Sequence, residues 1–424
     1  MRRAWCGAVR CAKVGVNMIS PLAIVFLVIL VDLIGFGIVI PILPLYAHGF
    51  GASPLVIGLL LGAYSAMQFL AAPVLGRLSD RVGRRPVLLL SLAGTALGFL
   101  FMGMARSLGL LFVARILDGV TGGNLSTAQA YIADVTPPKD RSRRMGLIGA
   151  AFGLGFILGP ALGGLLGHFS LAMPFLFASG LAGINTLAAA LWLPESLPRE
   201  RRAPREARSL TAMLRGPAHG SMRRIVAAYG LTTGAFSLLT ALYPLVTAHR
   251  FGYGAMENGV IFAGLGLLSA IVQGGLLGWM LKRASDHRLA MIGMAMLAAG
   301  LCLLPLTHAP ATLVLATAGL AIGHGLVAAP LSGMASKHAG AAVQGQVMGL
   351  LQSAASLARV VGPVAGGWLL MFDAAHPGAA FGRTPYWTAG AVTVSACLVA
   401  RGIRPARGAA AQPGVLAVAG DTGV

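Results

Sequence analysis

Residues Gly76–Pro86 read GRLSDRVGRRP, a short basic turn between two long apolar runs. Gly76 and Gly83 permit a tight turn, and Asp80 is the only acidic residue in it. Each flanking run is about 20 residues long, which is the length that a helix needs to cross a bilayer. The stretch therefore predicts a loop between two transmembrane helices.

The composition of the whole chain also indicates a membrane protein. Of its 424 residues, 57% are hydrophobic and only 10% are charged, too little charge to coat a soluble domain. Gly, at 59 residues, is about twice as frequent as usual, as expected for helices that pack closely in lipid. Twelve spans are predicted, near 20–43, 54–75, 86–104, 109–132, 145–167, 172–193, 223–247, 255–280, 288–306, 310–334, 342–370 and 384–402.

The net charge of +20 would suggest nucleic-acid binding in a soluble domain. Here the basic residues mark one side of the predicted membrane instead. Only Arg106, Arg250 and Arg383 fall in loops on the other side, while Arg115 and Arg359 fall inside spans. By the positive-inside rule both termini are cytoplasmic. We therefore expect the lipid bilayer, and no nucleic acid, as a partner.

A sequence repeat divides the chain into halves. MGLIGAAFGLGFILGPALGG (145–164) and MGLLQSAASLARVVGPVAGG (348–367) align without gaps, with 9 of 20 positions identical. Two homologous six-helix bundles around a central cavity are a transporter architecture, so the expected fold is an all-α integral membrane protein. The expected parts are a cytoplasmic segment at 1–19, bundles at 20–193 and 223–403 joined by a linker at 194–222, and a tail at 404–424. Whether Met1 or Met18 starts the chain stays open.

Four motifs together resemble the major facilitator superfamily. They are the loop GRLSDRVGRRP, LFVARILDGVTGG (111–123), GFILGPALGG (155–164) and DLIGFGIVIPILP (32–44), and the last two are similar to motifs of its drug/proton antiporters. Within that branch, SDRVGRRPVLLLSL (79–92) and RFGYGAMENGVIFAGLGLL (250–268) look like tetracycline efflux proteins. The resemblance implies export of a small-molecule drug in exchange for protons, by a monomer in a bacterial inner membrane, with no cofactor but the proton gradient.

The chain departs from tetracycline exporters at three positions. Those proteins carry an acid in helix three, a histidine in helix eight and an acid in helix nine, where this sequence has Gly98, Ser269 and Leu297. The resemblance therefore favours a broader drug antiporter of the same branch over a dedicated tetracycline exporter.

Three charged residues in the spans are candidates for proton coupling. Asp32 lies near the middle of helix one, where a lipid-facing carboxylate would cost about 2.5–3.5 kcal/mol, so it should face the interior. With a movable cationic partner such a carboxyl group can take up and release a proton near neutral pH. We expect Asp32 to be the main coupling site, with Arg115 tuning its charge. Asp118, one helical turn beyond Arg115, either holds a second proton or neutralises that arginine.

The loop motif predicts a conformational latch. The resemblance implies that Asp80 contacts the N-terminus of helix eleven, and we expect Arg84 to pair with Asp134 at the end of helix four. In the second half Gly278 matches Gly76 and Lys282 takes the place of Asp80, which implies one latch rather than two. The expected latch residues are Gly76, Asp80, Arg81, Gly83, Arg84 and Asp134.

Helix five is expected to pack tightly on its neighbours. Its glycines permit close contact, and Pro160 removes a backbone donor and can bend the helix. The resemblance implies a hinge or interface that prevents ion leak, and plain packing is the alternative. The antiporter-motif residues are Gly155, Gly159, Pro160, Gly163 and Gly164.

Polar and aromatic residues at the depth of the spans are candidates for substrate binding. Arg359 either holds an anionic or polar part of the substrate or extends to the membrane surface. The histidines and cysteines show no metal-ligand spacing, and the spans contain no nucleophile-and-base set, so neither a metal site nor an enzyme is expected. Two alternatives stay open, namely proton-coupled uptake of a polar nutrient and a receptor without transport. The candidates are Tyr64, Gln68, Asn124, Gln129, Tyr243, Gln273, His324, Gln352 and Arg359.

Overall fold

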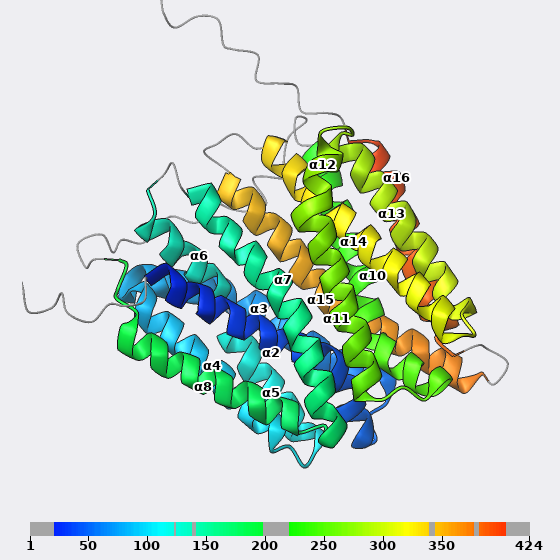
Figure 1. Ribbon diagram of the computed structural model, residues 1–424, viewed down its shortest axis with the longest axis horizontal. Coiled ribbons are helices and arrows are strands. Elements are labelled where there is room, and N and C mark those ends of the chain that lie inside the picture. Colours follow the sequence, from blue (N-terminus) through cyan, green and yellow to red (C-terminus); the bar gives the residue numbers. More distant parts are fainter. Residues whose placement is uncertain are drawn as a thin grey trace, which may run out of the picture.

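The computed structural model describes residues 21–122, 124–137, 141–197, 220–338, 344–376 and 381–403, and in these residues all regular elements are helices. The expected terminal segments, 1–19 and 404–424, and most of the linker lie outside the described residues. Figure 1 shows two groups of long helices lying side by side.

The first group follows the first six predicted spans. Apolar residues fill these helices, and Ser53 and Ser107 accept backbone N–H groups at the starts of two of them, as helix caps do. The helices are α2 (Pro21–Gly49), α3 (Pro54–Val82), α4 (Arg84–Gly103), α5 (Leu108–Thr121) with α6 (Asn124–Val135), α7 (Arg141–Phe169) and α8 (Met173–Trp192).

The second group follows the other six. It consists of α10 (Gly220–Phe251), α11 (Ala255–Ile271) continued by η4 (Val272–Leu276) and α12 (Leu277–Leu281), α13 (Asp286–Leu303) with η5 (Leu304–Leu306), α14 (Pro310–His338), α15 (Gln344–Ala375) and α16 (Arg383–Arg401). Among the described residues, eleven helical segments are long and apolar enough to cross a membrane. The twelfth, α16, begins with the polar and aromatic run RTPYWT and is less apolar, but it packs on α10 and α13 within the group.

Besides the ninth span, which ends in the 3-10 turn η5, two predicted spans are not regular α-helices throughout. The fourth is interrupted between α5 and α6, where Gly122 ends α5. A Cβ atom at Gly122 would lie 2.9 Å from the Tyr64 hydroxyl, so only glycine lets that ring approach the backbone. The eighth span contains the π-helix η4, of sequence VQGGL. Such single turns occur frequently at functional sites, and this one carries Gln273.

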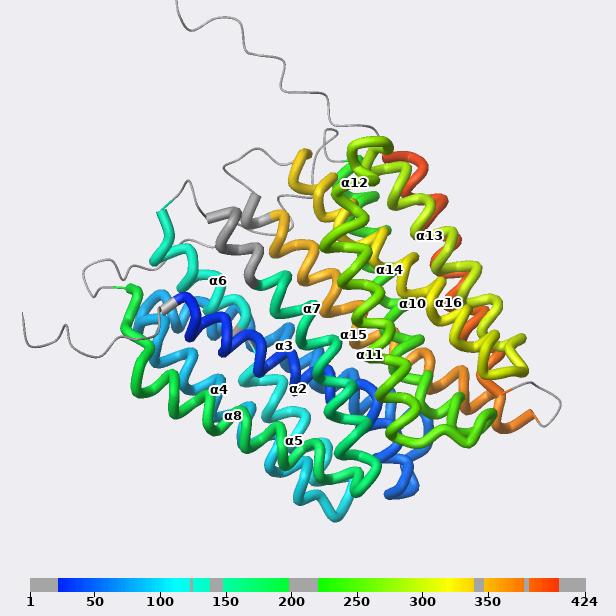
Figure 2. The backbone as a smooth tube through the Cα atoms, viewed as in Figure 1, coloured from blue at the N-terminus to red at the C-terminus, as the bar shows by residue number. Residues whose placement is uncertain are grey.

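The two groups meet along three pairs of helices, α3 with α15, α7 with α11, and α2 with α10. We call the end of the molecule that holds Gly76–Pro86 the loop end and the opposite end the far end. In the tube of Figure 2 the two groups approach each other at the far end and diverge toward the loop end, where α6 and α12 lie.

At the far end, glycines bring the two groups into backbone contact. Cβ atoms at Gly58 and Gly367 would lie 2.2 Å from the carbonyl oxygens of Pro363 and Pro54, respectively. On the other side, Gly164 of α7 meets Gly259 of α11, where a Cβ atom would lie 2.8 Å from the facing Cα. We call these contacts the glycine seal. No side chain can enter them without moving a helix.

The apolar core has the same asymmetry. One cluster of buried residues joins the two groups and includes Ile38 and Leu60 from the first and Leu242 and Tyr386 from the second. The cluster around Ile29 and Tyr131 draws on the first group alone, and the one around Met294 and Leu351 on the second alone. The two halves therefore share a core at the far end and have separate cores at the loop end.

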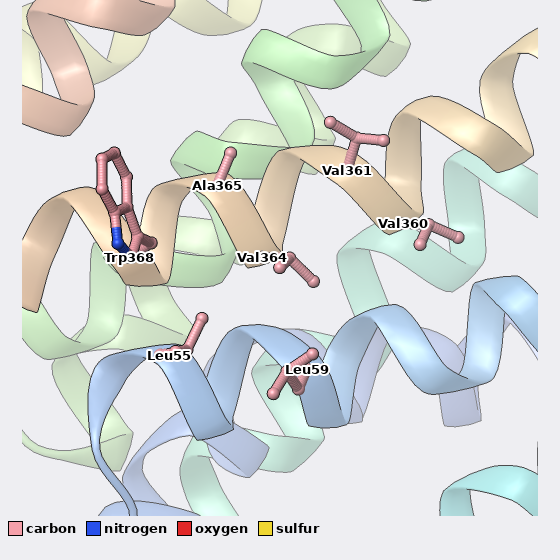
Figure 3. A pocket seen from close by; sticks show the side chains of 7 residues that line it. All are labelled: Leu55, Leu59, Val360, Val361, Val364, Ala365 and Trp368. Atoms are coloured by element: carbon pink, nitrogen blue, oxygen red, sulfur yellow. The ribbon is translucent and has the colours of Figure 1, made fainter.

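A shallow apolar groove follows the seam between α3 and α15 near the far end (Figure 3). Its walls carry Val361 and Trp368, whose side chains are more than half exposed, so the groove opens on the outer surface of the helix bundle. No charged residue lines it, and it is therefore suited to lipid. The lining residues are Leu55, Leu59, Val360, Val361, Val364, Ala365 and Trp368.

Candidate functional site: a buried charge cluster

A buried ion pair lies on α5. Arg115 Nη1 stands 3.0 Å from Asp118 Oδ2, and the two side chains are only 2% and 6% exposed. The spacing of three residues places both on one face of the helix, as expected from the sequence. Because an unpaired charge at this depth would be costly, each residue stabilises the ionised form of the other.

Tyr64 on α3 connects this pair to other charged residues. Its ring lies under the Arg115 guanidinium, 4.4 Å from centroid to Cζ, a cation–π contact. Its hydroxyl accepts a 3.0 Å hydrogen bond from Gln68, which also donates to the Gly122 carbonyl at 2.8 Å. The close approach of α3 and α5 requires a glycine at position 119, where a Cβ atom would lie 2.6 Å from the Tyr64 carbonyl oxygen.

Electrostatic interactions extend from Tyr64 to both halves of the chain. The charges of Asp32 on α2 and Arg359 on α15 lie close enough to Tyr64 to act electrostatically on its hydroxyl group, as do those of Arg115 and Asp118. Asp32 is half-buried, and Phe36, one turn further along α2, has its ring centroid 6.1 Å from that of Tyr64. We call Asp32, Tyr64, Arg115, Asp118 and Arg359 the charge cluster.

Arg359 belongs to the same interior region. It lies on α15 next to Val360, whose backbone faces Gly62 of α3, and so immediately on the loop-end side of the glycine seal. Its Nη2 donates to the Ser356 hydroxyl at 3.1 Å, and it interacts electrostatically with the tyrosines Tyr229 and Tyr64. The side chain is therefore directed to the seam between the halves, which argues against its extension to the membrane surface.

A second polar network lies at the loop end. Arg84 contacts Asp80 at 2.6 Å, Asp134 at 3.1 Å and the Ser79 hydroxyl at 2.6 Å, so the pair expected between Arg84 and Asp134 is present. Asp80 pairs with Arg84 in its own half. The structure thus places the Asp80 carboxylate in this network. Its contact with the N-terminus of α15, the eleventh span, stays a prediction, because the side chains of residues 344–346 lie outside the described residues.

The turn itself follows from two residues. Gly83 has φ 112°, a conformation that side chains strongly disfavour, and it separates α3 from α4. Glu195, which follows α8, accepts the backbone N–H groups of Arg84 and Arg85 at 2.9 and 3.3 Å and caps α4. No local pattern predicts this cap, because Glu195 is 111 residues from Arg84 in the chain. Of the remaining predicted latch residues, Gly76 has open space around it and Arg81 is exposed.

The second half carries an ion pair at the corresponding place. Asp286, in the first turn of α13, pairs with Lys337 in the last turn of α14. Asp286 begins α13 as Arg84 begins α4, and Lys337 lies in the last turn of α14 as Asp134 lies in the last turn of α6, with the signs reversed. That this half carries no second latch stays a prediction; the Asp286–Lys337 pair is a charge-reversed counterpart of the Arg84–Asp134 pair. Lys282, at the place of Asp80, is exposed.

The glycines of α7 face two helices. Cβ atoms at Gly155 and Gly159 would lie 2.6 Å from Leu33 and Ile34 of α2, and one at Gly163 would lie 3.3 Å from Ile38. Gly164 faces α11 in the glycine seal. Pro160 lies inside α7, with its ring against Gly37. The motif thus clamps α7 between α2 of its own half and α11 of the other.

Comparison with known proteins identifies the family. The family model of the Major Facilitator Superfamily matches residues 25–363, and again 275–416. The chain belongs to the Major Facilitator Superfamily. It is thus a multi-pass membrane transporter, not an enzyme, and it takes a small-molecule substrate.

Relatives and solved structures refine this placement in the superfamily. The class C tetracycline resistance protein of Escherichia coli is 37% identical over 81% of this chain and 88% of its own length. The crystal structure of the human organic anion transporter MFSD10 has a TM-score of 0.68 at 27% identity and covers 89% of this chain and 98% of its own. A bacterial homologue of the lysosomal transporter Spinster, in an inward-facing and occupied conformation, has a TM-score of 0.76 at 15% identity, covering 90% and 95%.

The structure shows what surrounds the three positions at which the sequence departs from tetracycline exporters. Gly98 packs directly on Asp118, and a Cβ atom on it would lie 2.9 Å from the Asp118 Cβ. Ser269 bonds to the Ala321 carbonyl at 3.5 Å, and Leu297 is fully buried in the apolar core. Two of the positions therefore have packing roles, while the first adjoins the buried ion pair.

The substrate candidates lie in different surroundings, and some of them adjoin the charge cluster. Gln129, Gln273 and Gln352 are exposed, whereas Tyr243 is buried, bonds to Thr317 at 2.8 Å and packs edge-on against Phe262, so it belongs to the core. His324 stacks on Phe236 with centroids 3.7 Å apart and rings nearly parallel. The side chain of Asn124 lies outside the described residues. Only Tyr64, Gln68 and Arg359 join the charge cluster or touch it.

Proposed function

We propose that this transporter exports amphipathic drugs, tetracycline-like or other, in exchange for protons by alternating access. The observation that carries the proposal is the Arg115–Asp118 pair, buried on α5 beside the Tyr64 ring, with the charge of Asp32 near the same tyrosine. A carboxylate next to a guanidinium can change its proton occupancy as the pair opens and closes. Named relatives include tetracycline resistance proteins and an organic anion transporter, which supports an amphipathic substrate.

The arrangement of the halves supports one step of the cycle. The glycine seal closes the far end, and the separate cores of the loop end leave the charge cluster on the loop-end side of that seal. With the loop end in the cytoplasm of a bacterial cell, as the basic loops predict, this state receives drug from the cytoplasm. In the opposite state Asp80 would latch the loop end against the start of α15, the eleventh span.

Exchange requires that proton and drug favour opposite states. We propose that Asp118 and Asp32 share the coupling role. In the drug-accepting state the proton leaves the acids, and the cationic part of the drug takes its place near them. In the other state the drug leaves and external protons neutralise the acids, which permits the return. Arg115 tunes Asp118 directly through the 3.0 Å pair.

The test is transport in everted membrane vesicles that contain the full chain. A pH gradient, acid inside, should drive uptake of a fluorescent amphipathic drug and of tetracycline, and a protonophore should abolish it. Asp32→Asn and Asp118→Asn should each lower gradient-driven uptake at least about tenfold while the amount of inserted protein is unchanged. Gradient-driven uptake at the normal rate in the double Asn variant would rule out this coupling site.

The same vesicles separate exchange from uptake of a nutrient. Drug entering by exchange should release protons from the vesicle, which alkalinises its lumen, whereas a symporter would move drug and proton in the same direction. A lack of response to any drug in the panel, at measured expression, would reject the proposed function.

A further inference from the structure

Arg359 differs from the other intramembrane arginine because no ion pair joins it to an acid among the residues that the structure describes. Arg115 has Asp118 at 3.0 Å, whereas the only hydrogen bond of the Arg359 side chain within the described residues is to the Ser356 hydroxyl. Its electrostatic partners, Tyr229 and Tyr64, are both neutral phenols. The five N–H donors of a guanidinium are poorly satisfied by one hydroxyl oxygen.

Its place in the fold makes this charge expensive. Arg359 is half-buried between the halves. It precedes Val360, which contacts Gly62, and therefore lies next to the glycine seal, on the side that faces the loop end. Intramembrane charges without a partner are rare and mark substrate or ion sites. A counter-charge that comes and goes with the transport cycle removes the cost when it is bound.

We propose that Arg359 binds a carboxylate or similar oxyanion of the exported compound, and that the substrates are zwitterionic amphiphiles. A guanidinium matches a carboxylate with two parallel hydrogen bonds. The positive group of the substrate faces Asp32 and Asp118 in the first half, while its negative group faces Arg359 in the second. The rings of Tyr64 and Phe36 lie at the first-half end of this site, with centroids 6.1 Å apart, and suit an aromatic body.

The positive group follows from the sign of the coupling, and here the inference rests on the proposed function. A protonated acid cluster is more positive, so it would hold a purely anionic substrate more tightly. Proton and anion would then bind together, which is the opposite of exchange. A substrate that also carries a positive group competes with the proton at the acids, and exchange is restored. The pairing of acids in one half with a lone arginine in the other thus selects for zwitterions.

The experiment compares two fluorescent probes that differ in one charge. Ciprofloxacin carries a carboxylate and an ammonium group, whereas its ethyl ester keeps the ammonium and loses the carboxylate. Initial gradient-driven uptake of each is measured in everted vesicles with the natural chain, Arg359→Gln, Arg359→Lys and the control Arg383→Gln. Arg383 is a cation of the same half that stacks on Trp387 outside the charge cluster.

We expect the natural chain to move ciprofloxacin faster than the ester. Arg359→Gln should lower ciprofloxacin uptake at least about tenfold, the value of a charge-assisted hydrogen bond, and change ester uptake less than about twofold. Arg359→Lys should keep part of the preference, because it retains the charge but not the fork. Arg383→Gln should leave both rates unchanged.

The other outcomes are equally decisive. A natural chain that moves the ester but not ciprofloxacin overturns the zwitterion inference and leaves the proposed function standing. An equal loss of both probes in Arg359→Gln, with inserted protein unchanged, assigns Arg359 a structural role. No gradient-driven uptake of either probe, or of the wider drug panel, overturns the proposed function and this inference with it.

Discussion

Asp118 lies directly against Gly98, so that a Cβ atom on α4 at this position would stand 2.9 Å from the Cβ of Asp118 on α5. Tetracycline exporters, which the sequence resembles, place an acid at the position of Gly98. In this chain the acid and the small residue occupy facing helices, and the space between α4 and α5 admits only one of the two side chains.

Gly98→Ala is therefore expected to impair coupling without preventing insertion. Because the added methyl group would lie 2.9 Å from the Asp118 Cβ, it must displace Asp118 and stretch its contact with Arg115. Overpacking of this size costs about 1–3 kcal/mol. We expect gradient-driven uptake to fall about tenfold at an equal amount of inserted protein. Gly180→Ala on α8 is the matched control, since a Cβ atom there would meet nothing within 4 Å. Equal rates in both variants would contradict the steric coupling.

The two loop-end ion pairs should differ greatly in their contribution to stability. Arg84 is 7% exposed and holds Asp80 and Asp134, so Arg84→Ala leaves two carboxylates without their cation and should cost about 3 kcal/mol. Lys337 is 63% exposed, and Lys337→Ala should cost less than about 1 kcal/mol. The apparent melting temperature in detergent, followed by fluorescence-detected size exclusion, measures both. A larger loss in Lys337→Ala would contradict this ranking.

Glu195 should stabilise the start of α4. Its carboxylate accepts the N–H groups of Arg84 and Arg85, and caps of this kind are worth about 0.5–2 kcal/mol. Glu195→Ala should lower the apparent melting temperature, whereas Glu195→Gln, which keeps an acceptor oxygen, should lower it less. Glu257→Ala provides a comparison, because that residue caps the start of α11 at an exposed site. Indistinguishable Ala and Gln variants of Glu195 would argue against the cap.

The glycine seal should not tolerate a side chain. In Gly58→Leu the new side chain would meet the Pro363 carbonyl, so α3 and α15 must separate and the far-end-closed state is lost. We expect transport to fall below detection. Closure is measured by cross-linking Leu55→Cys to Val364→Cys, which line one groove, in a background without native cysteines. Cross-linking at the unmodified rate in Gly58→Leu would show that the seal can adapt.

Much of the architecture follows from local rules that a sequence displays. A 20-residue apolar run specifies a span wherever it lies, and a three-residue spacing places Arg115 and Asp118 on one helix face. The ion pair of Arg84 with Asp134 was expected from the resemblance of the loop motif to the superfamily, and the structure shows it.

Features that depend on contacts between distant helices were not predictable. The Tyr64 ring lies against Gly122 at the end of α5, and no local signal in GVTGGN specifies which glycine it meets. Glu195 caps a helix that begins 111 residues earlier. The Asp286–Lys337 pair was not predicted, because its acid and base are exchanged relative to Arg84 and Asp134. A comparison of the two halves for identical residues therefore does not find it. The apposition of Gly98 with Asp118 likewise requires the packing of α4 on α5.

The glycine seal also bears on how such a transporter can change its drug spectrum. The contacts of the seal are made by backbone atoms, and a side chain added at its glycines would collide with the facing helix. We therefore expect almost no single substitution of these glycines to be tolerated. Selection with a new antibiotic should therefore enrich changes around the charge cluster, for example at Phe36 beside Tyr64, and leave the glycines of the seal unchanged.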